Sequence, residues 1–122
     1  MSARGVLRIV QGGKVGFWCP GCNHMHVVGI STGVCDWGFN GNYDRPTFTP
    51  SVKVTGRDFT AAGRAAYEEW CARGHPKLPS GTSPPFESRA TCCHSFVRDG
   101  QIQFLGDCTH ALAGKTVPLE AF

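Results

Sequence analysis

The chain has 122 residues, of which 41% are hydrophobic and 17% charged, and its formal net charge is +3. This length supports one hydrophobic core but not two, and the 16 glycines and eight prolines exclude long helical bundles. No apolar run approaches the roughly 20 residues of a membrane helix, and the N-terminus lacks the apolar segment of a signal peptide. We therefore expect a soluble, cytoplasmic protein with no membrane partner, and the scattered basic residues argue against nucleic acid as a partner.

The N-terminal half predicts short strands rather than helices. Residues 6–10 and 15–18 are expected to form two strands around a glycine-containing turn that suits a tight hairpin. The β-branched run 27–30 favours a further strand. Residues 35–49 are rich in aromatics, Gly, Asn and Pro and predict an irregular segment, which leads into a short strand at 52–54.

The middle of the chain contains the one longer predicted helix. Residues 60–73 are rich in alanine, with Thr60 as the N-cap and Gly74 placed to end the helix. The following residues 75–90 contain four prolines and predict a long loop. We therefore expect residues 57–91 to be a helix-plus-loop insertion into the domain.

The C-terminal third predicts a hairpin. Residues 92–97 and 101–105 are expected to be strands joined by an Asp-Gly turn, followed by a short helix over 107–113 and an edge strand at 116–118. The sequence therefore predicts a single domain over residues 1–122 of the mainly β (α+β) class: a small antiparallel sheet domain with one inserted helix.

Seven cysteines in a chain without a secretion signal favour metal binding over disulfides, because the cytosol keeps thiols reduced and an odd count leaves one unpaired. Cys19-Pro-Gly-Cys22 has the spacing of a zinc knuckle. A thioredoxin-like redox pair is the alternative, but a β-branched run follows this motif instead of a long helix. Cys35 and Cys71 have no partner spacing and are expected to be small apolar fillers.

A structural Zn²⁺ site needs four ligands, and the chain has no second Cys-x-x-Cys motif. His26 lies close to the knuckle along the chain, and a hairpin could deliver Cys93 as the fourth ligand. The predicted metal ligands are therefore Cys19, Cys22, His26 and Cys93. Cys108 together with His110 is an open alternative.

Alternation along the predicted C-terminal strand separates two neighbouring residues. Successive side chains of a strand point to opposite faces, so Cys93 and His94 should not bind the same ion. If Cys93 binds zinc, His94 lies on the other face with Phe96, where it serves either chemistry or packing.

Three stretches carry a resemblance to a known family: Phe-Trp-Cys-Pro-Gly-Cys at 17–22, Arg-Pro-Thr-Phe-Thr-Pro-Ser at 45–51 and Cys-His-Ser-Phe-Val-Arg-Asp-Gly at 93–100. His26, Trp37, Phe104, Asp107, His110 and Gly114 accompany them. Together they resemble a small family of phage and bacterial zinc-binding domains that genomes often label, without good reason, as ammonia monooxygenase. Some relatives occur beside bacterial ubiquitin-like conjugation genes, where the family is regarded as a peptidase.

This resemblance implies a zinc-stabilised hydrolase, most simply a serine peptidase acting on a protein substrate. It directs attention to Ser51 as the nucleophile, with His94 as its base, His110 in support and Asp107 as an acidic group that orients the base. Copper oxygenase chemistry is not implied, because a thiolate-rich knuckle suits Zn²⁺ better.

Two alternatives compete with this hypothesis. A catalytic zinc with three protein ligands and a bound water would need a general base, and no glutamate lies beside the knuckle. A non-enzymatic zinc module, for example a phage accessory protein, would instead bind a protein partner through the aromatic segment 37–48. Weaker still is nucleic-acid binding through the same aromatics and the scattered arginines.

Overall fold

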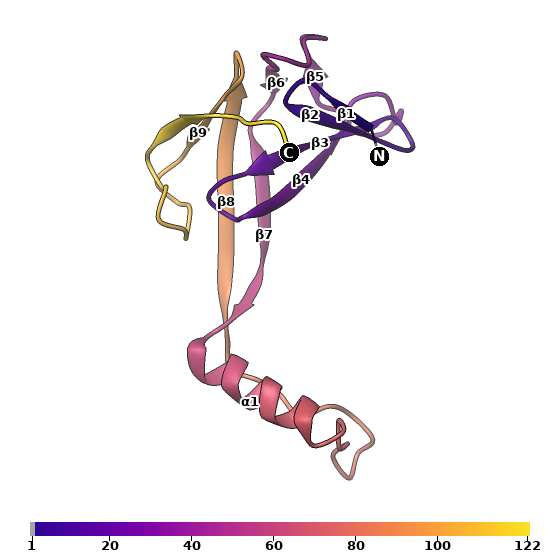
Figure 1. Cartoon of the computed structure of the whole chain (residues 1–122), viewed down its shortest axis with the longest axis vertical. Coiled ribbons are helices and arrows are strands. Elements are labelled where there is room, and N and C mark those ends of the chain that lie inside the picture. Colours follow the sequence, from indigo (N-terminus) through magenta and orange to yellow (C-terminus); the bar gives the residue numbers. More distant parts are fainter. Residues whose placement is uncertain (1) are drawn as a thin grey trace. The chain divides into compact units, whose positions relative to one another are not determined.

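The computed structural model describes residues 2–122, and they form a mainly antiparallel β structure with one α-helix (Figure 1). The fold class expected from the sequence is thereby confirmed. The elements in chain order are β1 (Ser2–Arg4), β2 (Leu7–Val10), β3 (Lys14–Cys19), β4 (His24–Gly29), β5 (Gly38–Phe39), β6 (Phe48–Thr49), β7 (Val52–Phe59), α1 (Ala61–Ala72), β8 (Ser88–Arg98), β9 (Gln101–Phe104) and β10 (Thr116–Pro118). The chain divides into two compact units. The first unit contains the residues up to Val54 together with Cys92–Phe122, and the second unit contains Thr55–Thr91.

The first sheet is an antiparallel meander with the strand order β1-β2-β3-β4. Gly12 and Gly13 both have positive φ in the turn between β2 and β3, a conformation that glycine adopts without a steric penalty. The turn that follows β3 contains the second cysteine of the knuckle, and the register pairs Cys19 with His24 across it.

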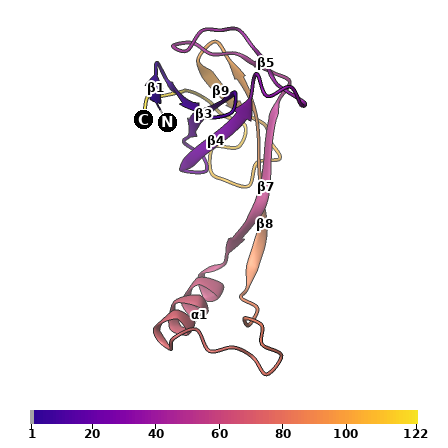
Figure 2. The same cartoon turned by 90° about the vertical axis from the view of Figure 1, so that its right-hand side faces the viewer.

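The second sheet has the strand order β10-β9-β8-β7, and β7 and β8 run side by side in both views (Figure 2). The expected hairpin between β8 and β9 is confirmed, with Asp99 at φ 53° and Gly100 at φ 78°. Both values are positive, as a two-residue turn that matches the strand twist requires.

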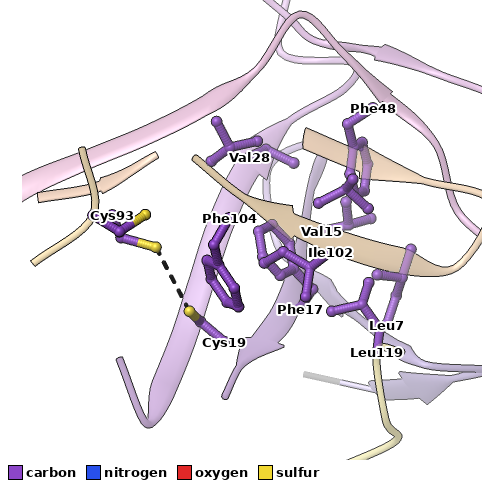
Figure 3. Close-up of a cluster of buried hydrophobic side chains, with 13 residues drawn as sticks. Leu7, Val15, Phe17, Cys19, Val28, Phe48, Cys93, Ile102, Phe104 and Leu119 are labelled. Carbon is purple, nitrogen blue, oxygen red and sulfur yellow. Dashed lines mark hydrogen bonds between the residues drawn. The ribbon is translucent and has the colours of Figure 1, made fainter. Parts of the chain in front are cut away.

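The core of the first unit is built from alternate residues of both sheets (Figure 3). Strand β8 alternates as expected, with Cys93, Ser95 and Val97 buried and the residues between them partly exposed. The largest fully buried side chains are Phe17, Phe48, Phe104, Leu7 and Ile102. Cys93 therefore points into this core, and His94 lies on the opposite face of the strand.

The second unit contains the predicted helix, which runs over Ala61–Ala72. Thr60 caps it, with its Oγ accepting a hydrogen bond from the Gly63 amide at 3.1 Å. Gly63 packs directly against the Glu87 carbonyl, so that a Cβ at this position would overlap that oxygen. A cluster of aromatic rings packs on the helix: Phe59, Tyr67, Trp70 and Phe86.

The structure departs from the predicted elements in several places. Strand β7 continues to Phe59, beyond the predicted range 52–54, and β8 begins at Ser88, within the predicted loop. Strand β1 and the two-residue pair β5 and β6 were not expected. The predicted helix over 107–113 is wrong, because this segment forms turns. The Thr109 amide donates to the Cys92 carbonyl at 2.9 Å, so this part of the backbone pairs with β8, and the local bond from the Ala113 amide to the His110 carbonyl closes a turn. The long-range pairing with β8 therefore outweighs the local capping signal at Asp107.

Candidate active site and metal centre

Ser51 lies between β6 and β7, at the end of a segment held by the β8–β9 turn. The Arg45 guanidinium bonds the Asp99 carboxylate at 2.7 Å. The Asp99 amide in turn donates to the Thr47 hydroxyl at 2.8 Å. These contacts join the segment that precedes Ser51 to the β8–β9 turn.

Ser51, His94 and Asp107 form a continuous hydrogen-bonded array. The Ser51 Oγ lies 2.9 Å from Nε2 of His94, and Nδ1 of the same ring lies 3.1 Å from the Asp107 carboxylate. The His94 side chain is 24% exposed and that of Asp107 is 50% exposed, so the array is reachable from solvent. A hydroxyl, an imidazole and a carboxylate in this order are the parts of a serine nucleophile with an oriented base.

Trp37 holds the backbone of the serine. Its indole Nε1 donates to the Ser51 carbonyl at 3.3 Å from a partly buried position. An indole N–H usually finds an acceptor when it is buried, and here the acceptor belongs to the residue that carries the hydroxyl.

Replacing Trp37 with Phe is therefore expected to keep the apolar packing and to remove only this donor. We expect the Ser51 hydroxyl to react about 10-fold more slowly with a reactive-serine probe, because a misplaced nucleophile loses rate steeply. Time courses of labelling measure this effect, and Trp70→Phe in the second unit is the matched control that should leave the rate unchanged. An unchanged rate in Trp37→Phe would contradict the role given to the indole.

A second cluster combines three thiols and one imidazole. One ligand atom from each of Cys19, Cys22, Cys93 and His110 lies within 4.8 Å of every other, and the group could hold a metal ion. The Sγ atoms of Cys19 and Cys93 are 3.7 Å apart (Figure 3). The Cys22 amide donates to the Cys19 sulfur at 3.3 Å, as expected for a knuckle in which backbone amides support sulfur charge.

Hydrogen bonds and burial shift the pKa values of the three thiols in different directions. Hydrogen bonding to Cys93 holds the pKa of Cys19 well below its usual range in spite of burial. The same interaction with Cys19 raises the pKa of Cys93, and burial raises that of Cys22. A second thiolate is therefore costly without a counter-charge, and a divalent cation would supply one.

The histidine of the cluster differs from the one expected. The sequence favoured His26 because it is close to the knuckle along the chain, whereas the four-residue group contains His110. The β3–β4 register sets His26 opposite Phe17, with its ring edge against that phenyl ring. The turn after β9 returns instead and lays the His110 ring on Gly21, where a Cβ would overlap it.

His110 lies in the thiol cluster; the sequence allowed two possible roles for it, support of Ser51 and, together with Cys108, an alternative metal ligand. Its Nε2 is buried without a hydrogen-bond partner, as is Nε2 of His26, which is 3% exposed. A buried imidazole nitrogen with no partner within a group of thiols fits a metal-binding role. Cys35 and Cys71 lie outside this group.

The aromatic segment 37–48 packs internally. Phe39 stacks on Phe48 with ring centroids 5.3 Å apart, and Tyr43 meets Phe39 edge to face at the same distance. Phe48 also stacks on Phe17 of the core. These rings therefore contribute to the packing of the first unit: Phe48 is fully buried, and Trp37, Phe39 and Tyr43 are partly buried against the core.

The described residues include no helix that is long and apolar enough to span a membrane. They define a small mainly β domain that pairs a Ser-His-Asp array with a cluster of three cysteines and a histidine. The chain belongs to the bacterial ubiquitination-like system serine protease (BubE) family, whose sequence model matches residues 1–105. No curated protein and no solved structure matches the chain.

The family match confirms the resemblance noted in the sequence and includes Ser51 and His94. Asp107 and His110 come just after the matched range. Their placement beside His94 and the thiols is therefore an observation of the structure alone.

Proposed function

We propose that the protein is a serine peptidase that hydrolyses a peptide bond of a protein substrate. The observation that carries the proposal is the array in which the Ser51 hydroxyl lies 2.9 Å from His94 and that imidazole lies 3.1 Å from Asp107. The family name supports a protein of a bacterial ubiquitination-like system as the substrate. We place this activity in the cytoplasm, where thiols are kept reduced and the seven cysteines remain available for metal binding.

Each residue of the array has a distinct role in this mechanism. The Ser51 Oγ attacks the scissile carbonyl while its proton passes to Nε2 of His94. The imidazolium then gives that proton to the leaving amine, and an acyl-serine remains. His94 next takes a proton from a water molecule, whose oxygen attacks the acyl carbon. As the bond between the acyl carbon and the Ser51 oxygen breaks, the imidazolium returns that proton to the Ser51 oxygen, which releases the carboxylic acid and restores the free enzyme.

Asp107 acts on the base rather than on the substrate. Its carboxylate accepts a hydrogen bond from Nδ1–H of His94, so that Nε2 is free to accept the proton of Ser51. It also stabilises the imidazolium that forms during the attack. Its side chain is half exposed, so water screens part of this stabilisation.

We propose Zn²⁺ as the ion of the cysteine cluster and assign it a structural role. For tetrahedral Zn²⁺ with Zn–S bonds of about 2.3 Å, two sulfurs lie about 3.8 Å apart. The 3.7 Å between the Cys19 and Cys93 sulfurs agrees with this spacing. Four protein ligands leave no place for a reactive water, so the ion would stabilise the fold while the serine carries the chemistry.

A fluorophosphonate probe tests the proposed function directly. The wild-type protein should form a covalent adduct at Ser51, located by peptide mass spectrometry, and Ser51→Ala should form none. Ser80→Ala is the matched control, because Ser80 is an exposed serine of the second unit that is bonded to Thr82 and not to an imidazole. A wild-type protein that stays unlabelled while it holds its metal would refute the serine mechanism.

A further inference from the structure

Cys108 makes two hydrogen bonds to the main chain of the proposed base. Its sulfur accepts from the His94 amide at 3.2 Å and donates its proton to the His94 carbonyl at 3.1 Å. The thiol is buried, with 9% of the residue exposed. Both hydrogen bonds join the sulfur to the main chain of His94, and Cys108 stands outside the four-residue metal cluster.

We call these two hydrogen bonds from Cys108 to the main chain of His94 the clamp. The position of His94 at the end of the strand pairing explains why the clamp is needed. The β8–β9 pairing runs from Arg98 to Ser95, which lies opposite Phe104, and one further main-chain bond follows it, from the Leu105 amide to the His94 carbonyl at 2.9 Å. One residue further on, the His94 amide has no strand partner on that side, and a buried amide without a partner is costly. The Cys108 sulfur takes this place, so the ladder that fixes β8 continues through a side chain.

The residues around Cys108 bind the same strand one after another. Asp107 reaches the imidazole of the base, and Thr109 bonds both main-chain groups of Cys92. His110 then joins Cys93 in the metal cluster. We call residues 107–110 the strap, because each of its members is tied to the strand that carries the base.

We propose that Cys108 is a positioning residue that fixes His94 against Ser51 from within the strap. This inference rests on the proposed serine mechanism and adds a residue to it. A base held within a few tenths of an ångström of the productive geometry transfers a proton far faster than one that wanders. The clamp acts on the main chain of His94, while Asp107 acts on its ring.

The experiment compares Cys108→Ala and Cys108→Ser with the wild type, and Cys71→Ala in the second unit serves as the control. Three quantities are measured: the maximal rate and the half-saturating concentration of fluorophosphonate labelling at Ser51, amide hydrogen exchange at His94 by NMR, and zinc per chain. The alanine variant should label about 10-fold more slowly at saturation, with an unchanged half-saturating concentration, and should exchange the His94 amide about 10-fold faster. The serine variant, whose hydroxyl can both donate and accept, should recover part of both effects.

The outcomes separate this inference from the proposed function. A wild-type protein that does not label contradicts the serine mechanism itself. A labelled wild type, with unchanged labelling and exchange in Cys108→Ala, overturns the clamp alone. If Cys108→Ala loses zinc, the zinc content of Cys108→Ser distinguishes the two explanations, because a hydroxyl can replace the hydrogen bonds of Cys108 but not a thiolate ligand. Zinc retained in Cys108→Ser supports the clamp, and zinc lost from Cys108→Ser overturns it.

Discussion

Replacing His94 with Ala is expected to slow the reaction of Ser51 by about 10³-fold or more, with the metal content unchanged. Without the imidazole, no group of the array can take the serine proton, and a neutral hydroxyl is a weak nucleophile. The measurement is the labelling rate with a fluorophosphonate, followed by intact-protein mass spectrometry. His24→Ala is the matched control, because this exposed histidine of β4 contacts neither Ser51 nor the strap.

Asp107→Asn should have a smaller effect than His94→Ala. An amide favours the wrong imidazole tautomer, and such a change can cost up to about 10⁴-fold in a serine protease. The Asp107 carboxylate is half exposed, so its field on the ring is partly screened, and the loss of fluorophosphonate labelling rate should fall below that limit.

The same measurement can contradict the role of the base: equal labelling rates for His94→Ala and the wild type would remove His94 from the mechanism.

Removal of the metal is expected to unfold the first unit. The purified protein should contain about one zinc ion per chain, and Cys19→Ser should contain less than half of that. Structural zinc contributes apparent binding energies of about 10–16 kcal/mol in small zinc domains, as much as the whole stability of a typical domain. Cys19 and Cys93 are themselves buried in the core, so the loss should appear as collapse of the thermal unfolding transition on chelation.

Paired histidine variants identify the fourth ligand. His110→Gln should lose zinc, and His26→Gln should retain it, because only His110 lies within the four-residue cluster. Elemental analysis of both purified proteins gives the answer. The reverse result would restore His26 as the ligand, in agreement with the sequence-based expectation.

The elements that could be predicted from sequence are those set by neighbouring residues. The Asp-Gly turn after β8 and the Thr60 cap of the helix are local signals, and the structure contains both. The pair β5 and β6 has two residues in each strand, too short to produce an alternation pattern. The capping signal at Asp107 was misleading because the Asp107 carboxylate bonds His94 instead of the start of a helix.

In the candidate site too, the features set by neighbouring residues could be predicted, and those set by the pairing of distant segments could not. Strand alternation alone was sufficient to separate Cys93 from His94. The choice between His26 and His110 depends on where the turn after β9 returns, and no local pattern encodes that path. The role of Cys108 likewise depends on the end of the β8–β9 ladder, a feature of strand pairing and not of composition.

The alternation of β8 also makes the positions of Cys93 and His94 depend on a single strand register. A shift of the strand by one residue would exchange the faces of Cys93 and His94, so the imidazole would enter the core and the sulfur would leave the cluster. The thiol cluster and the hydrogen bond between Ser51 and His94 would be lost together. A chain paired in the wrong register therefore retains neither site, so both sites depend on one and the same strand register.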